Sequence, residues 1–180
     1  MGRAKRRPKP LPVKLFCGLI GSEASIAEAV KRLEREFGVV HFASPVIPFE
    51  FTNYYREEMG CDLVRQWIAF EVLRERAYLP RAKHVAVRIE RALSVDNKRT
   101  VNIDPGYVDN AQVVLATGKN YAHRIYIGMG YYAEATLIHI HGRFRPLEWT
   151  YPDCKGRVGI SFFEGARSLY RKQMRNQVES

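Results

Sequence analysis

The segment that decides the fold is residues 14–44, KLFCGLIGSEASIAEAVKRLEREFGVVHFAS. It begins with a short apolar run, Lys14–Ile20, whose length and composition are typical of a buried strand. Ser25 is predicted to open a helix as its N-cap, and Gly38 is predicted to end that helix. Val39–Ser44 is then expected to be a second strand, so the segment predicts a β-α-β unit at the start of the domain.

The chain then repeats this alternation. A strand is expected at Leu63–Leu73, a helix from Leu79-Pro80, where proline occupies a first-turn position, and a strand at Arg99–Ile103 that Pro105-Gly106 ends. The other expected elements are strands at His123–Gly128, Tyr131–His141 and Phe144–Tyr151 and a helix at Ile160–Gln177, while Asp109 either caps a short helix or precedes a strand.

This order of elements predicts an α+β fold. Two β-α-β units are typical of a ferredoxin-like sandwich, with an added antiparallel hairpin or meander and a C-terminal helix. Helices are expected to cover one face of a largely antiparallel sheet. The chain of 180 residues is expected to form a basic, proline-rich tail over 1–13 and a single domain over 14–180.

The net charge of +10 comes largely from the N-terminal segment. Residues 1–14 contain six Lys or Arg and no acid, so removing them leaves +4 for the remaining chain. Clustered cations bind nucleic-acid phosphates, which makes residues 1–14 and the basic C-terminal helix a candidate RNA interface. A solubilising extension is the simpler interpretation and is favoured.

Several protein classes are excluded by what the sequence lacks. No apolar run reaches the roughly 18 residues that a membrane span needs, and the basic N-terminus is followed by no apolar signal-peptide core, so a cytoplasmic location is expected. Three separated cysteines without a CxxC pair argue against a zinc knuckle or a disulfide framework. Gly-rich phosphate loops, GxSxG, HExxH and an RNP1-like strand are also missing.

Residues 102–153 concentrate the chemically useful side chains. Asp104 stands before a Pro-Gly turn, where a carboxylate is either a backbone cap or a general base or metal ligand. Lys119, His123 and Arg124 follow, and they form either a solvated basic loop or a binding group for a phosphate or carboxylate. His123 is also a candidate proton shuttle, because imidazole changes its charge near neutral pH.

Glu134 lies inside an apolar strand, and this position requires an explanation. If its face of the strand is the core, the carboxylate needs a partner, and Arg124 across the hairpin is the candidate. A structural Glu–Arg pair is favoured. The alternative is a divalent metal such as Mg²⁺ held by Asp104, Glu134 and Glu148.

Five stretches of the chain together resemble an uncharacterised bacterial family that is catalogued only as a domain of unknown function of about this length. They are FTNYYREEMG at 51–60, VNIDPGYV at 101–108, LATGKNYAHRIYIG at 115–128, YAEATL at 132–137 and LEWTYPD at 147–153. The resemblance extends over nearly the whole chain after the basic tail, and it implies no established activity.

Two functions therefore remain as expectations. The first is a small enzyme or ligand-binding protein that acts on an anionic small molecule of phosphorylated or nucleotide-like type. Its catalytic residues would be Asp104, His123 and Glu134, and its ligand-binding residues would be Tyr107, Lys119, Arg124 and Tyr55. The second is an RNA-associated accessory protein that uses the basic tail and the C-terminal helix.

Overall fold

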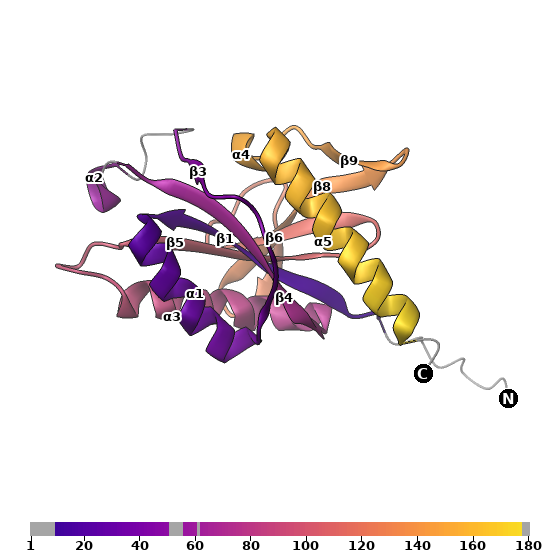
Figure 1. Cartoon of the computed structure of the whole chain (residues 1–180), viewed down its shortest axis with the longest axis horizontal. Coiled ribbons are helices and arrows are strands. Elements are labelled where there is room, and N and C mark those ends of the chain that lie inside the picture. Colours follow the sequence, from indigo (N-terminus) through magenta and orange to yellow (C-terminus); the bar gives the residue numbers. More distant parts are fainter. Residues whose placement is uncertain (1–9, 51–55, 61, 178–180) are drawn as a thin grey trace, which may run out of the picture.

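The computed structural model describes residues 10–50, 56–60 and 62–177, and it is a mixed α+β structure built on one antiparallel sheet (Figure 1). The strands are β1 (Val13–Gly21), β2 (Val40–Ala43), β3 (Ile47–Pro48), β4 (Val64–Arg74), β5 (Val101–Val108), β6 (Gln112–Thr117), β7 (Ile125–Gly128), β8 (Tyr131–Ile140) and β9 (Arg143–Pro146). The helices are α1 (Glu23–Phe37), α2 (Arg56–Met59), α3 (Leu79–Ala92), α4 (Pro152–Lys155) and α5 (Arg157–Asn176), with a 3₁₀ turn at Arg76–Tyr78.

Strand β1 is buried along its whole length because helices cover both faces of the sheet (Figure 1). Leu15, Cys17 and Leu19 pack in one core cluster with residues of α1 and α3. Phe16 points to the opposite face and packs against Phe163 of α5, with ring centroids 5.1 Å apart. The expectation that helices cover only one face is therefore wrong, because α5 supplies a second apolar layer.

The strand order is β2-β4-β1-β5-β6-β8-β7, with β3 also paired to β4 and β9 to β8. The strands of the units β1-α1-β2 and β4-α3-β5 interleave. Strand β4 lies between β1 and β2, and strand β1 lies between β4 and β5. The later strands extend the sheet beyond β5, so the nine-stranded sheet of the described residues is larger than the sequence predicts.

Strand β5 continues through Pro105-Gly106 instead of ending there, which corrects the predicted boundary. It pairs with β6 only between Gly106–Val108 and Val113–Leu115. In a strand, the N–H groups of residues two apart point to the same edge. The N–H that Pro105 lacks would therefore lie on the same edge as the N–H of Ile103. The ladder with β6 stops at this proline, and the two strands separate.

Gly106 is required where the strands are still together. A Cβ at this position would lie 2.3 Å from the carbonyl oxygen of Val114 and 2.5 Å from Phe16 Cζ. The PG pair therefore has two effects: glycine permits the close contact of β5 and β6, and proline ends it.

Two other predicted boundaries need correction, and the alternative left open at Asp109 is decided. Helix α1 begins earlier than predicted, since Ser22 is the N-cap and its side chain accepts a hydrogen bond from the backbone N–H of Ser25. Asp109 precedes a strand, the second of the two predicted alternatives, and its carboxylate accepts backbone N–H groups of the turn into β6 at 2.7 and 2.8 Å. The strand predicted over Phe144–Tyr151 ends at Pro146, and the following segment turns into α4.

Lys14 belongs to the core and not to an exposed basic arm. Its side chain is fully buried, and Nζ donates to the Phe70 carbonyl at 2.9 Å and to Gln173 Oε1 at 2.8 Å and lies 3.0 Å from His41 Nδ1. Burial lowers the pKa of Lys14 to about 8. The proposed RNA interface over 1–14 therefore loses this residue, and residues 1–9 lie outside the described part of the chain.

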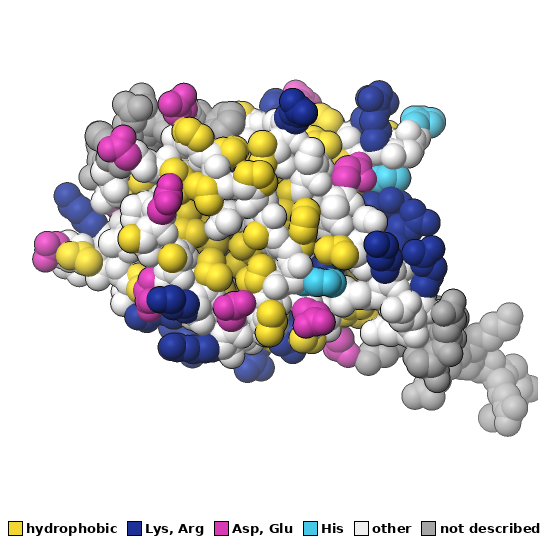
Figure 2. Space-filling view, viewed as in Figure 1, with side chains coloured by type: hydrophobic (Ala, Val, Ile, Leu, Met, Phe, Trp, Pro, Cys, Tyr) yellow, Lys and Arg dark blue, Asp and Glu magenta, His cyan; other side chains and the backbone are white. Residues whose placement is uncertain are grey.

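Basic side chains on α5 and the apolarity of the helices complete the description of the fold. Figure 2 shows Lys and Arg side chains gathered over the later half of α5, where Arg171, Lys172 and Arg175 are exposed. Within the described residues, no helix is both long and apolar enough to cross a membrane.

Candidate functional site

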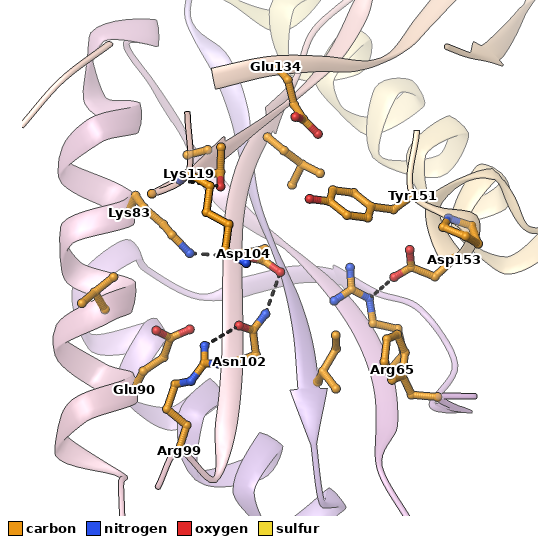
Figure 3. A pocket seen from close by; sticks show the side chains of 18 residues that line it. Arg65, Lys83, Glu90, Arg99, Asn102, Asp104, Lys119, Glu134, Tyr151 and Asp153 are labelled. Carbon is orange, nitrogen blue, oxygen red and sulfur yellow. Dashed lines mark hydrogen bonds and ion pairs between the residues drawn. The ribbon is translucent and has the colours of Figure 1, made fainter. Parts of the chain in front are cut away.

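A cavity of about 560 Å³ opens where β5 and β6 separate (Figure 3). Its walls come from the open part of the sheet, from α3 and from the segment leading into α4. Its charged lining residues are equal in number by sign: Arg65, Lys83, Arg99 and Lys119 against Glu90, Asp104, Glu134 and Asp153. Such a concave hollow with convergent charged side chains is the first place to look for a small-molecule site.

Two side chains of α3 take the place of the missing strand at the edge of β5. Lys83 Nζ donates to the carbonyl oxygen of Ile103 at 2.9 Å, and Glu90 Oε1 accepts the N–H of the same residue at 2.6 Å. Burial opposes the charge of Lys83, but Asp104 and Glu90 raise its pKa above the usual value. Burial raises the pKa of Glu90, against the lowering effect of Lys83. The main role of this buried pair is to satisfy backbone groups that β6 leaves unpaired.

Asp104 is held at the end of a chain of polar contacts. Its Oδ2 accepts from Asn102 Nδ2 at 2.7 Å, and its Oδ1 lies 3.3 Å from Lys83 Nζ. Asn102 accepts in turn from Arg99 Nη1 at 2.9 Å, and Arg99 forms an ion pair with Glu58 at 2.6 Å. Both oxygens of Asp104 thus have partners, so its position is fixed by the protein.

Glu134 points into the cavity from β8 (Figure 3), and its side chain is only 2% exposed. Its Oε2 accepts from Arg124 Nε at 2.7 Å and lies 2.9 Å from His123 Nε2. Arg124 also donates to the carbonyl oxygen of Lys119 and to the hydroxyl of Tyr151. The predicted Arg124–Glu134 pair is confirmed. The other oxygen, Oε1, is buried and has no hydrogen-bond partner in the described part of the chain.

An aromatic stack fixes His123 against Glu134. The imidazole lies parallel to Trp149, with ring centroids 4.7 Å apart and an interplanar angle of 10°. Trp149 is itself held by a hydrogen bond from Nε1 to the carbonyl oxygen of Ala135 at 2.8 Å. Tyr121 lies on the outer side at 5.4 Å between centroids. The stack restrains the imidazole orientation, so the Glu134 carboxylate is held by Arg124 and a restrained His123.

Arg65 is the functional candidate that sequence reasoning missed. It lies on β4 with a side chain 4% exposed, and its guanidinium rests over Gly18, where an added Cβ would be 2.7 Å from Nη2. Its Nε is 3.0 Å from Asp153 Oδ2, an ion pair whose N–H direction does not meet hydrogen-bond geometry. Its Nη1 is buried without a partner among the described residues. A charged residue within an apolar strand, on the same side as Trp67, is the sequence signal for it.

The structure brings some of the predicted residues together and separates others. Asp104, Lys119 and Glu134 line the cavity, and His123 and Arg124 lie behind Glu134. Tyr107 is 9% exposed and packs in a different cluster with Leu79, away from the cavity lining. Glu148 is exposed, and Tyr55 lies outside the described residues.

The metal alternative does not match the positions of the carboxylates. Across residues 10–50, 56–60 and 62–177, no three His, Cys, Asp or Glu side chains are grouped so that they could hold a metal ion. Asp104, Glu134 and Glu148 are therefore not assembled into a metal centre.

Comparison with known proteins identifies the family. The model of a family described as Domain of unknown function (DUF4416) matches residues 11–170. No curated protein and no solved structure matches the chain. Because the match extends over nearly the whole sequence, the chain belongs to this family, and the resemblance noted from the sequence is confirmed.

Proposed function

We propose that this member of the DUF4416 family binds a small molecule through an oxyanion, a phosphate or a carboxylate, in the cavity between β5 and β6. The single observation that carries the proposal is the Arg65 guanidinium, which is 4% exposed at the cavity wall and whose Nη1 has no partner among the residues that the structure describes. A buried N–H without an acceptor is costly, and a bound oxyanion would remove that cost.

The setting of Arg65 supports an anion more than a neutral acceptor. The guanidinium is a planar fork whose geometry matches carboxylate and phosphate oxygens. Its ion pair with Asp153 uses Nε, Nη1 has no acceptor within the described residues, and Figure 3 shows the guanidinium at the cavity wall. Lys83, Arg99 and Lys119 contribute further positive charge to the same lining.

The balance of charges limits the size of the anion. Glu90, Asp104, Glu134 and Asp153 line the same hollow, so several clustered negative charges would be repelled. One oxyanion group fits this arrangement better than a polyphosphate chain. The proposed ligand is therefore a singly phosphorylated or carboxylated molecule, and a nucleoside monophosphate is within this class.

Calorimetric titration of propyl phosphate and of butyrate into the full chain tests the proposal. Arg65→Gln alone would leave Asp153 uncompensated, so the informative variant is Arg65→Gln/Asp153→Asn, which removes both charges and shortens only the side chain at position 65. We expect this variant to bind at least about ten-fold more weakly, because a charge-assisted hydrogen bond is lost. Arg143→Gln, an exposed change on β9, is the matched control.

Two results would contradict the proposal: no binding of either oxyanion to the unmodified chain, or equal affinity for the chain and the double variant. A reduced affinity in Arg143→Gln as large as that in the double variant would show that binding follows overall charge and not the cavity.

We also propose that β1, β4, β2 and β5 with α1 and α3 form a ferredoxin-like core, in a protein of the cytoplasm. The interleaved strand order β2-β4-β1-β5 supports this assignment of the core. On this assignment, β6 to β9 and α5 are additions, and the cavity lies where the core meets them.

A further inference from the structure

Glu134 is the second buried charged group at the cavity that keeps an unpartnered atom. Its carboxylate is 2% exposed, and Oε2 is occupied by Arg124 and His123. Oε1 has no donor among the described residues, and Figure 3 shows the carboxylate directed into the hollow. A buried carboxylate oxygen without a donor is unfavourable, so the site is incomplete on this side until a donor arrives.

The two buried groups that lack hydrogen-bond partners among the described residues line the same cavity. In the described part of the chain, Arg65 on β4 has an N–H without an acceptor, and Glu134 on β8 has an oxygen without a donor. Strands β1, β5 and β6 stand between β4 and β8 in the sheet, so the two groups are at opposite sides of the opening. A single small molecule satisfies both only if it carries an acceptor at one end and a donor at the other.

The positive charge of Arg124, already paired with Glu134, decides which kind of ligand donor fits. The Arg124 guanidinium lies 2.7 Å from Oε2 and supplies a full positive charge. A second cation, such as a ligand ammonium, would place two positive charges on one carboxylate. A neutral hydroxyl supplies the hydrogen bond without that repulsion.

We infer that the cavity selects a hydroxylated oxyanion, with a hydroxyl group donating to Glu134 Oε1 and the phosphate or carboxylate on Arg65. This inference rests on the proposed function and narrows its ligand class to polyol phosphates, sugar phosphates, the sugar moiety of a nucleoside monophosphate, and hydroxy acids. Arg124, His123 and the Trp149 stack act as positioning groups, because they hold the carboxylate in the orientation that receives the hydroxyl.

A matched set of probes tests this assignment by calorimetry on the full chain. Glycerol 3-phosphate and propyl phosphate differ in two hydroxyls, and 3-aminopropyl phosphate has an ammonium in place of the terminal hydroxyl of glycerol 3-phosphate and lacks the other hydroxyl. We expect glycerol 3-phosphate to bind at least about ten-fold more tightly than propyl phosphate, the effect of one hydrogen bond to a charged group. Glu134→Gln should remove most of this preference and should not weaken propyl phosphate binding, because it removes a negative charge from the lining, while Glu148→Gln, an exposed control, should keep the preference.

The outcomes separate the two proposals. Equal binding of glycerol 3-phosphate and propyl phosphate overturns the hydroxyl assignment alone, as does tighter binding of 3-aminopropyl phosphate than of glycerol 3-phosphate or a preference that survives in folded Glu134→Gln. Failure of all three phosphates and of butyrate to bind overturns the proposed function itself. The comparison of probes on the unmodified chain decides the question even where Glu134→Gln does not fold.

Discussion

Lys83 donates from Nζ to the backbone carbonyl of Ile103 at 2.9 Å, so a helix side chain occupies the place that a neighbouring strand would take. Glu90, two turns later on the same helix, accepts the N–H of Ile103. This arrangement lets β5 and β6 separate without leaving the edge of β5 unpaired. The cavity exists because the sheet is opened here, and its opening is maintained by two buried charges.

Replacing Lys83 with Met is expected to destabilise the fold strongly. The change leaves the Ile103 carbonyl without its donor and removes the cation next to Asp104 and Glu90. The loss should be on the order of 3 kcal/mol in the free energy of unfolding, measured by urea denaturation. Arg91→Met, an exposed change on the same helix, should alter it by less than about 0.5 kcal/mol. Equal effects of the two changes on the free energy of unfolding would show that the contact of Lys83 with the Ile103 carbonyl does not stabilise the fold.

Arg124→Ala should also reduce stability by about 3 kcal/mol, because it leaves a carboxylate that is 2% exposed without its cation. The double variant Arg124→Ala/Glu134→Gln should recover part of the loss, since the carboxylate charge at position 134 is then also removed. Arg124→Lys should fall between, because an ammonium cannot reach Glu134, the Lys119 carbonyl and the Tyr151 hydroxyl together. Thermal and urea melts measure all three. A loss below about 1 kcal/mol in Arg124→Ala would mean that His123 alone compensates Glu134.

Gly18→Ala should weaken anion binding although it replaces no charged residue. The new Cβ would lie 2.7 Å from Arg65 Nη2, so the guanidinium must move from its place over β1. We expect the affinity for propyl phosphate to fall about ten-fold, as for loss of one charge-assisted bond. Gly118→Ala is the control for stability, since a Cβ there meets no atom within 4 Å. An unchanged affinity in Gly18→Ala would show that the position of Arg65 is irrelevant to binding.

Much of the fold could be predicted from local pattern. The first β-α-β unit, the helix that begins at Leu79 and the hairpin of β7 and β8 follow from periodicity and turn residues. The Arg124–Glu134 contact also followed, because the two residues are only ten positions apart on a predicted hairpin. Short-range pairing of this kind can be derived from alternation and strand order.

The opened sheet and Arg65 could not be predicted in the same way. Whether β5 and β6 stay paired beyond Gly106 depends on side chains of α3, which pack against β5 only in the folded chain. The pairing of Arg65 with Asp153 joins residues at distant points of the sequence. The proline in IDPG predicts the end of a strand, whereas in the structure it ends only the pairing on one edge of β5.

Stability should rise with pH above 8 because of Lys14. Burial lowers the pKa of Lys14 from 10.5 to about 8 in the folded chain. Between these values the unfolded chain holds the proton and the folded chain does not, so the free energy of unfolding increases with pH. Over that range the contribution approaches about 3 kcal/mol.

The measurement is the difference in free energy of unfolding between the unmodified chain and Lys14→Met at pH 7.5, 9 and 10. This difference should move in favour of the unmodified chain as pH rises. Lys155→Met, an exposed control, should give a constant difference. A constant difference for Lys14→Met as well would mean that the buried ammonium stays charged throughout.

The most direct test of the central claim, that the opened sheet is an anion site built on Arg65, is the position of a heavy oxyanion in crystals of the full chain. Tungstate soaked into such crystals should give an anomalous peak inside the cavity, with a tungstate oxygen within hydrogen-bond distance of Arg65 Nη1, and the peak should vanish in Arg65→Gln/Asp153→Asn. An empty cavity, with tungstate bound instead only at the exposed Arg171, Lys172 and Arg175 of α5, would contradict the account.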